Sequence, residues 1–369
     1  MAVPLIPLYV AQLNPRSPLA GPTLAISFVL SGLFSPLWGK LATRYGTKPM
    51  LIRSSLMICL AYALSANATS VSGLFLSRCL AGVASGFVPI ASSTLAQLST
   101  PETRNRDLSW ITSFRTGGTL AGPAIGAAIV WSTGSYRITF LASAGLSLFT
   151  LSAALISPNI KVQDRSISTQ LQTRHTTKTA YWMPICAVFA LTVSSMLLGT
   201  WLPLSLSSSS SAISAAPVLA TITTASALIT MTLAPFWGQL ADRRKPGLIL
   251  ILTLILPIPI ILGLLFSDNH LTVGFLIIAA SAVGADTIGL LSAETTKKLA
   301  EQDIAPFFGW TNTATQYGNA LGAGLAPIAM GMWTQLPIVL SVALDLLSVL
   351  IIFIFLKSGA DGQYASRGE

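Results

Sequence analysis

The chain has 369 residues, of which 52% are hydrophobic and only 9% are Asp, Glu, Lys or Arg. Soluble domains carry about 25% charged residues, so this composition excludes a soluble globular protein and indicates a membrane protein. The formal net charge of +9 does not indicate nucleic-acid binding, because the basic residues lie in short segments between apolar stretches rather than along one face.

Apolar stretches of about 20 residues, enough to cross roughly 30 Å of hydrocarbon, recur along the chain. Residues 1–13 are apolar but cover only about 20 Å as helix, so we interpret them as the outer end of a first helix whose inner half is absent. Further spans are predicted near 18–39, 49–67, 71–98, 107–131, 136–157, 181–204, 215–237, 247–267, 271–293, 306–331 and 336–356. We therefore expect an all-α integral membrane protein with twelve spans.

The predicted spans fall into two groups of six. Residues 1–157 form an N-terminal six-helix bundle, and residues 181–356 form a C-terminal one. The polar segment 158–180 joins them as a cytoplasmic loop, and residues 357–369 form a cytoplasmic tail.

An internal repeat supports this division. The stretch S-P-L-W-G-K-L-A-T-R-Y-G-T-K-P at 35–49, expected to be a glycine-broken hairpin, returns as A-P-F-W-G-Q-L-A-D-R-R-K-P at 234–246 with an offset of 199. A second echo, at an offset of 200, pairs Trp110 with Trp310, Gly118 with Gly318 and Gly122 with Gly322. Duplicated halves in a hydrophobic chain are typical of secondary transporters.

The distribution of basic residues predicts the orientation. If the 39–49 hairpin is cytoplasmic, the cytoplasmic segments and the adjoining span ends hold 17 Lys or Arg, including Arg53, and the outer loops and their adjoining span ends hold only Arg16 and Arg137. This asymmetry follows the positive-inside rule. We expect a multi-pass protein of the inner (plasma) membrane, with both termini cytoplasmic if the first helix is complete.

Three motifs resemble those of the major facilitator superfamily, and within it the bacterial drug:proton antiporters with twelve helices. The loop signature G-x-L-A-D-R-x-G-x-K is matched by Gly39, Leu41, Ala42, Arg44, Gly46 and Lys48, with Thr43 at the acidic position. The helix 4 signature R-x-x-x-G is matched by Arg78 and Gly82, and the helix 5 signature G-x-x-x-G-P-x-x-G by Gly118, Gly122, Pro123 and Gly126. The resemblance implies the major facilitator fold, with two six-helix bundles related by pseudo-two-fold symmetry.

The glycines of the helix 5 signature have an i, i+4, i+8 spacing, so they form one smooth stripe that allows close helix contact. Pro123 should bend the helix at this stripe. The stripe either serves packing alone or, as the resemblance implies, seals helix 5 against the other half. Gly318 and Gly322 on helix 11 are its symmetric counterpart.

Away from the span ends, the predicted spans contain four charged residues: Arg78, Arg115, Asp286 and Asp345. A carboxylate in a low-dielectric site favours its neutral form, so it could bind and release a proton near neutrality. We assign the proton to Asp286, with an ion pair or hydrogen bond within the bundle as the alternative, and expect a structural contact for Asp345. The resemblance implies that Arg78 faces the central cavity, where it could act on Asp286, whereas Arg115 could simply extend to the interface.

The second copy of the hairpin, with Gly238, Asp242 and Arg243, is expected to act as a latch. Asp242 could pair with Arg243 or Arg244, or cap a neighbouring helix N-terminus. Thr43 carries no charge, so the first-half latch should be weaker. The aromatic residues that could face a substrate cavity are Phe87, Trp310 and Tyr317, each of which could instead be packed or lipid-facing.

These observations predict a secondary active transporter that exports small, mostly apolar compounds in exchange for protons by alternating access. Two alternatives are a transporter of one metabolite, sugar or siderophore, and a truncated relative that does not transport. The expected partners are a small-molecule substrate, protons and the lipid bilayer. We expect a monomer without enzymatic activity, cofactor, metal or nucleic acid, because the chain offers no convincing metal or nucleophile constellation.

Overall fold

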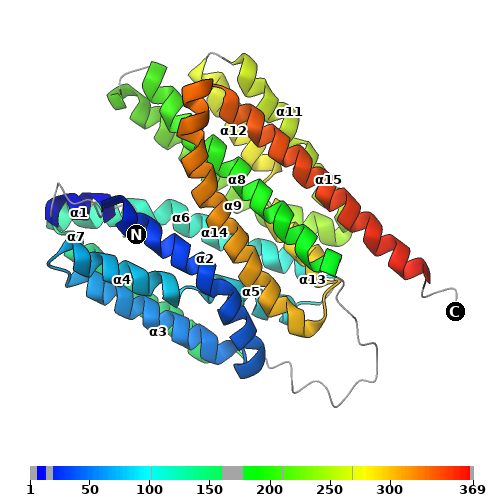
Figure 1. Ribbon diagram of the computed structural model, residues 1–369, viewed down its shortest axis with the longest axis horizontal. Coiled ribbons are helices and arrows are strands. Elements are labelled where there is room, and N and C mark those ends of the chain that lie inside the picture. Colours follow the sequence, from blue (N-terminus) through cyan, green and yellow to red (C-terminus); the bar gives the residue numbers. More distant parts are fainter. Residues whose placement is uncertain are drawn as a thin grey trace. The chain divides into compact units, whose positions relative to one another are not determined.

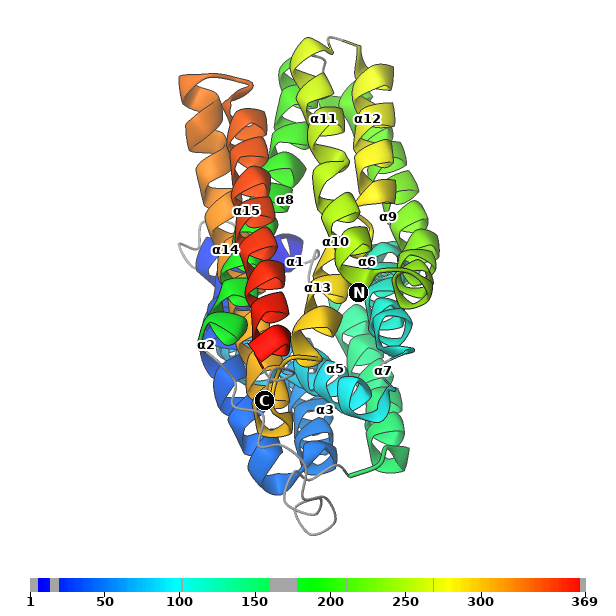
Figure 2. The same ribbon diagram turned by 90° about the vertical axis from the view of Figure 1, so that its right-hand side faces the viewer.

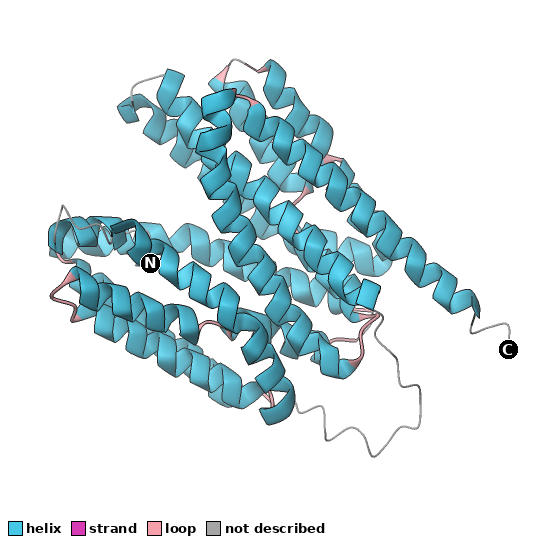
Figure 3. Ribbon diagram, in the orientation of Figure 1, coloured by secondary structure: helices cyan, strands magenta, loops and turns pink. Residues whose placement is uncertain are grey.

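The computed structural model describes residues 6–13, 20–100, 102–159, 178–209, 212–267 and 269–365. All regular secondary structure in these ranges is helical (Figure 1, Figure 3). Most of the segment 158–180 and the last four residues of the chain lie outside the described residues, so the predicted loop and the end of the predicted tail are not addressed.

The described residues of the first half form seven helices. They are α1 (Ile6–Leu13), α2 (Ala20–Tyr45), α3 (Thr47–Ala66), α4 (Val71–Ala84), α5 (Phe87–Leu98), α6 (Arg104–Thr133) and α7 (Tyr136–Ile156). The second half contains α8 (Lys178–Ser209), α9 (Ala212–Arg243), α10 (Pro246–Ile255), α11 (Pro257–Leu262), η3 (Gly263–Phe266), α12 (His270–Val283), α13 (Thr287–Thr296), α14 (Glu301–Met332) and α15 (Leu336–Ala365). Several of these helices continue one another across a short break, as α10 and α11 do in Figure 2.

Seven segments of the described chain are long and apolar enough to cross a membrane. They are α3, α4 with α5, α7, most of α8, α10 through η3, α12 with α13, and α15. The other long helices, α2, α6, α9 and α14, contain 26 to 32 residues. At the repeat offset, α2 corresponds to α9 and α6 to α14.

The described helices pack into two compact units. Unit 1 comprises residues 1–94, 118–172 and 301–316, and unit 2 comprises residues 95–117, 173–300 and 317–369. Each unit therefore contains the first turns of a helix from the other half of the sequence. Unit 1 takes the start of α14, and unit 2 takes the start of α6.

Each unit has its own apolar core. In unit 1 a cluster of Ile6, Tyr9, Val10, Ala66, Val71, Leu74 and Phe140 joins α1, α3, α4 and α7. In unit 2 a larger cluster includes Trp201, Leu202, Ile258, Ile261 and Ile338. Helices α8 and α15 pack along each other within this unit (Figure 1).

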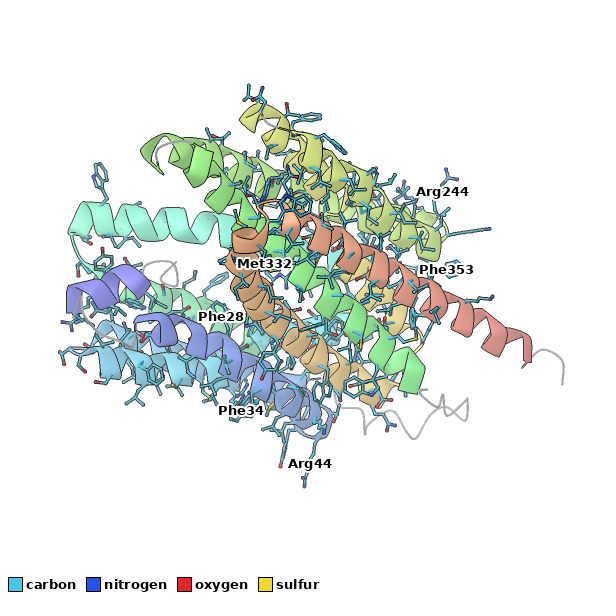
Figure 4. All side chains as sticks on the ribbon, turned by 45° about the horizontal axis from the view of Figure 1, so that its top comes forward. Phe28, Phe34, Arg44, Arg244, Met332 and Phe353 are labelled. Carbon is cyan, nitrogen blue, oxygen red and sulfur yellow. The ribbon has the colours of Figure 1, made fainter. Side chains whose placement is uncertain are left out.

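The hairpin predicted at residues 39–49 differs in its details. Helix α2 runs through Gly39 to Tyr45, and α3 begins at Thr47, so the break is a single residue, Gly46. Gly46 has φ 91°, a left-handed conformation that glycine adopts without a Cβ penalty. The basic residues of the predicted hairpin are therefore helical, and the side chain of Arg44 extends from the end of α2 (Figure 4).

Candidate functional site

The carboxyl group of Asp286 lies at a break in a membrane helix. Helix α12 ends at Val283, and α13 begins at Thr287 with Asp286 as its N-cap residue. Asp286 is only 1% exposed. A side chain at Gly289, one turn further along α13, would meet the carboxyl group, so this glycine makes room for it.

Three residues of α6 surround this carboxyl group within unit 2. The Ser109 hydroxyl lies within hydrogen-bond distance of Asp286 Oδ2, and the charge of Arg115 acts on the carboxyl group. The Thr112 hydroxyl also interacts with it, although Oδ1 is buried and accepts no hydrogen bond of normal geometry from the described residues. The sequence singled out Asp286 and Arg115 but not Ser109, because a serine in a membrane helix has no distinguishing signal.

Asp242 caps the N-terminus of α6 from the end of α9. Its Oδ1 accepts hydrogen bonds from the backbone N–H of Asn105, at 3.2 Å, and from the Asn105 side chain, at 2.7 Å. Its Oδ2 accepts one from the backbone N–H of Arg106, at 2.9 Å. Asp242 was expected either to pair with a neighbouring arginine or to cap a helix, and these hydrogen bonds form the cap. The cap also places a negative charge at the positive end of the helix dipole.

The equivalent position in the first half makes no such contact. The Thr43 hydroxyl donates to the Lys40 carbonyl, at 2.7 Å, within its own helix. Helix α14 starts after Ala300 without a side-chain cap and instead carries Glu301 and Asp303 in its first turn. The two copies of the hairpin motif are thus chemically different. Of the remaining hairpin residues, Arg243 is exposed in the last turn of α9, and Arg44 lies 5.4 Å from the Tyr45 ring.

The motif glycines allow close helix contacts. A side chain at Gly39 would lie 2.6 Å from the carbonyl oxygen of Ala305, and one at Gly238 would lie 2.9 Å from Cα of Arg106. These partners are themselves related by the repeat offset of 199. Gly39 therefore packs against the start of α14 within unit 1, and Gly238 against the start of α6 within unit 2.

Another symmetric contact involves the motif tryptophans. Trp38 Nε1 donates to the Val83 carbonyl, at 2.9 Å, and Trp237 Nε1 donates to the Ala282 carbonyl, also at 2.9 Å. Both carbonyls lie next to a helix break, between α4 and α5 in unit 1 and between α12 and α13 in unit 2. A break removes helical partners from the neighbouring carbonyls, so each indole satisfies one of them. Gly86, with φ 128°, forms the first of these breaks.

The helix 5 stripe and its counterpart lie in different surroundings. A side chain added at Gly118 would meet no described atom within 4 Å. Gly122 and Gly126 are buried. Helix α6 continues through Pro123. The side chain of Pro123 lies outside the described residues.

Gly318 and Gly322 pack closely against α8, where a side chain at Gly322 would lie 2.7 Å from the Val193 carbonyl. Helix α8 belongs to the same half of the sequence as α14. These two glycines therefore allow close packing within the second half, because α14 crosses α8 backbone to backbone at this point.

Arg78 is enclosed within unit 1 rather than open to a cavity. It is 1% exposed, donates from Nη2 to the Ser65 hydroxyl at 2.6 Å, and lies over the rings of Tyr62, at 5.0 Å, and Phe140, at 5.7 Å. Its Nε is buried without a hydrogen-bond partner among the described residues. The expectation that Arg78 faces a cavity does not hold in this arrangement, because α3, α4 and α7 surround it.

The remaining predicted residues occupy varied positions. Asp345 is buried on α15 and interacts with Ser194 of α8, a contact within the packed pair of helices. Phe87 packs on the apolar cluster around Leu51 and Ile90 in unit 1. Trp310 in unit 1 is partly buried, and Tyr317 in unit 2 is 36% exposed. No cluster of metal-ligating side chains occurs in the part of the chain that the structure describes.

Helices that can cross a membrane, duplicated halves and a buried carboxyl group at a helix break are typical of a multi-pass membrane transporter. Residues 1–323 match the Major Facilitator Superfamily, and the chain belongs to this family. The resemblance drawn from the motifs and the predicted fold class are thereby confirmed. The protein is a transporter of small molecules and not an enzyme.

Among curated proteins, the chain is 26% identical over 335 residues to the multidrug resistance protein MdtG of Proteus mirabilis (strain HI4320), covering 87% of this chain and 83% of the relative. It is 34% identical over 152 residues to the multi-drug resistance efflux pump PmrA of Streptococcus pneumoniae serotype 4 (strain ATCC BAA-334 / TIGR4), covering 40% of this chain and 38% of the relative.

Two solved structures share the fold. The human organic anion transporter MFSD10 (TETRAN) superposes with a TM-score of 0.76 at 17% identity, covering 94% of this chain and 88% of the other. The fucose:proton symporter FucP of E. coli superposes with a TM-score of 0.75 at 13% identity, covering 96% of this chain and 94% of the other.

Proposed function

We propose that the protein exports small, mostly apolar compounds in exchange for protons by alternating access, and that Asp286 carries the proton. The names of the curated relatives, a multidrug resistance protein and a multi-drug efflux pump, support the substrate class. In this proposal the bundles formed by residues 1–157 and 181–356 rock against each other, and the segment 158–180 connects them.

The observation that carries the proton assignment is the geometry around Ser109. Its hydroxyl oxygen lies within hydrogen-bond distance of Asp286 Oδ2 and, at 2.7 Å, of the Asn105 carbonyl oxygen. A hydroxyl has a single proton to donate. Both contacts are full hydrogen bonds when the carboxyl group of Asp286 is protonated and donates to Ser109, which then donates to Asn105. This arrangement favours a protonated Asp286.

The same segment of α6 links the proton site to the latch. Asn105 accepts from Ser109 through its carbonyl and donates to Asp242 through its backbone and side chain. When Asp286 loses its proton, Ser109 must turn its own proton toward the carboxylate and release the Asn105 carbonyl. The first turn of α6 is then held less firmly. The charge of Arg115 acts on Asp286. Arg115 is therefore the positive charge near the proton site that was expected to be Arg78.

Opening toward the cytoplasm would require the close contacts at Gly39 and Gly238 to separate. Each joins the cytoplasmic end of a helix from one half of the sequence to the first turns of a helix from the other half. A proton-dependent change at residues 105–109 of α6 acts directly on the second of these contacts, since Arg106 is the residue that Gly238 meets.

Transport in proteoliposomes tests the proton assignment. Asp286→Asn keeps the size of the side chain but cannot exchange a proton, so we expect it to abolish efflux driven by a proton gradient while downhill exchange persists. Asp345→Asn is the matched control, because Asp345 is also a buried carboxylate in unit 2 but has no place in the network, and we expect it to retain gradient-driven efflux. Near wild-type pumping by Asp286→Asn would place the proton site elsewhere.

A panel of chemically unrelated substrates tests the substrate class. Competition among several apolar, cationic and neutral compounds for one transport activity would support multidrug export. Activity toward a single sugar or siderophore, with no effect of the apolar compounds, would favour the alternative of a specific metabolite transporter.

The proposed orientation in the inner membrane has its own test. Single cysteines replacing Thr43 or Arg244 should react with an impermeant maleimide only from the cytoplasmic side, and those replacing Ala68 or Ser209 only from outside. The basic residues beside Thr43 and Arg244 predict this pattern. The reverse pattern would contradict the proposed topology, in which a monomer has both termini in the cytoplasm if its first helix is complete.

A further inference from the structure

Unit 1 has an open groove of about 670 Å³ along one face of α3. Two cationic side chains, Lys48 and Arg53, line it together with the apolar side chains of Pro49, Ile52, Leu56 and Met57. Two positive charges beside an apolar surface are complementary to a molecule with an anionic head and a hydrocarbon chain.

Arg53 is incompletely satisfied by the protein. One face of its guanidinium group stacks on the Trp38 ring, at 3.4 Å from the centroid, and Nη2 donates to the Ser85 carbonyl at 3.3 Å. Nη1 donates only to a weak acceptor, the Met57 Sδ atom, at 3.7 Å. Its Nε is buried without a hydrogen-bond partner, and no carboxylate lies within ion-pair distance of Arg53 among the residues described. A full charge inside a membrane helix is costly unless an anion or water accompanies it.

The spacing of the groove residues matches the cross-section of a lipid monolayer. Lys48 lies in the first turn of α3, and Arg53 lies about 7.5 Å deeper at 1.5 Å per residue. Leu56 and Met57 lie roughly one turn further into the hydrocarbon region. A bilayer whose surface lies at the start of α3 would place the two cations at the level of the phosphates and glycerol esters, and the apolar residues at the level of the acyl chains.

We propose that this groove binds one acidic phospholipid of the cytoplasmic leaflet. The lipid phosphate lies between Lys48 and Arg53, and one acyl chain runs over Ile52, Leu56 and Met57. The assignment to the cytoplasmic leaflet rests on the orientation given under the proposed function. The repeat does not duplicate this site, because the position equivalent to Arg53 in the second half is Leu252.

The lipid would act on the first helix break. Arg53 holds the Ser85 carbonyl, directly at the junction of α4 and α5, and its Trp38 partner holds the neighbouring Val83 carbonyl. A phosphate that draws the guanidinium group outward competes with the Ser85 contact. Occupancy of the groove is thereby coupled to the geometry of the break.

Native mass spectrometry of the purified full chain tests this proposal, with dioleoylphosphatidylglycerol as the acidic lipid and dioleoylphosphatidylcholine as the neutral one. Each basic residue near an anionic lipid surface contributes about a fivefold gain in affinity. We expect one phosphatidylglycerol to bind preferentially to the wild-type chain, and Arg53→Gln and Lys48→Gln each to weaken it on the order of fivefold. Lys357→Gln, which removes an exposed positive charge at the predicted cytoplasmic end of α15, should leave the affinity unchanged.

Equal retention of phosphatidylglycerol by wild type and both groove variants would overturn the site, as would an equal loss in Lys357→Gln or an equal preference for phosphatidylcholine. Lys48→Gln keeps the test valid if Arg53→Gln fails to fold, because Lys48 is only partly buried and its hydrogen bond to Asn159 comes from the backbone N–H, which the substitution retains. Binding in detergent depends on neither transport nor orientation. Loss of the proposed export function would therefore leave this result intact, and reversed labelling at position 43 would move the site to the outer leaflet.

Discussion

Substitution of Asp242 by alanine should weaken the latch and shift the protein toward states in which the start of α6 is released from α9. The substitution removes three hydrogen bonds of 2.7 to 3.2 Å and the charge at the helix N-terminus. Loss of an N-cap typically costs 0.5–2 kcal/mol, and hydrogen bonds to charged groups lie at the upper end of this scale. We therefore expect about 2 kcal/mol, equivalent to a change of about 30-fold in the equilibrium between capped and released states.

Thr43→Ala at the equivalent position of the first half is the matched control. Its hydroxyl bonds only to the Lys40 carbonyl of its own helix. A hydrogen bond within an exposed helical turn contributes little, so we expect a change of less than about twofold in the same equilibrium.

Pulsed electron–electron double resonance between spin labels at positions 102 and 244 measures the separation between the start of α6 and the end of α9. Both positions are exposed, at the beginning of α6 and just after α9. The three native cysteines, Cys59, Cys79 and Cys186, are replaced first. We expect Asp242→Ala to populate a longer distance that is minor in the wild type. Superimposable distance distributions, or an equal shift in Thr43→Ala, would refute the cap as the source of the latch.

Two further predictions concern helix packing and the helix breaks. Gly322→Ala places a methyl group against the backbone of α8 and should destabilise the protein by about 1–3 kcal/mol in thermal unfolding. Gly118→Ala has open space around it and should be close to neutral. Equal melting temperatures of the two variants would contradict the packing argument. Trp237→Phe leaves a carbonyl at the α12–α13 break without its donor and should lower the free energy of unfolding by about 1–3 kcal/mol. Trp38→Phe should do the same at the α4–α5 break. A destabilisation confined to one of the two variants would show that the breaks are not equivalent.

The apolar stretches located the membrane helices closely. The predicted span 71–98 became α4 and α5, and the predicted span 136–157 became α7, which ends one residue earlier. Span length and hydrophobicity depend on the bilayer, which acts on each segment separately, so local sequence contains this information. The helix ends were less accurate, since helices such as α2 and α9 extend beyond the apolar stretch into polar residues that remain compatible with helix.

The breaks within α4–α5 and α12–α13 were not predicted. Each segment has a high mean hydropathy over its whole length despite Arg78 and Asp286, so hydropathy gives no indication of an interruption. The motif tryptophans were visible only as repeated letters. Their role became apparent when folding brought Trp38 and Trp237 to carbonyls 45 residues further along the chain.

The sequence by itself determined the fold class, the duplication and the scarcity of charge inside the spans, which singled out Asp286 because an ionisable group in a bilayer is costly wherever its helix lies. Tertiary structure decided the partners: Ser109 reaches Asp286 across 177 residues, and Asp242 caps α6 across 137. It also enclosed Arg78 in aromatic rings and placed Gly318 and Gly322 against α8. Hydrogen bonds and close packing act over a few ångströms, so their pairing depends on which helices adjoin, and no local pattern contains that information.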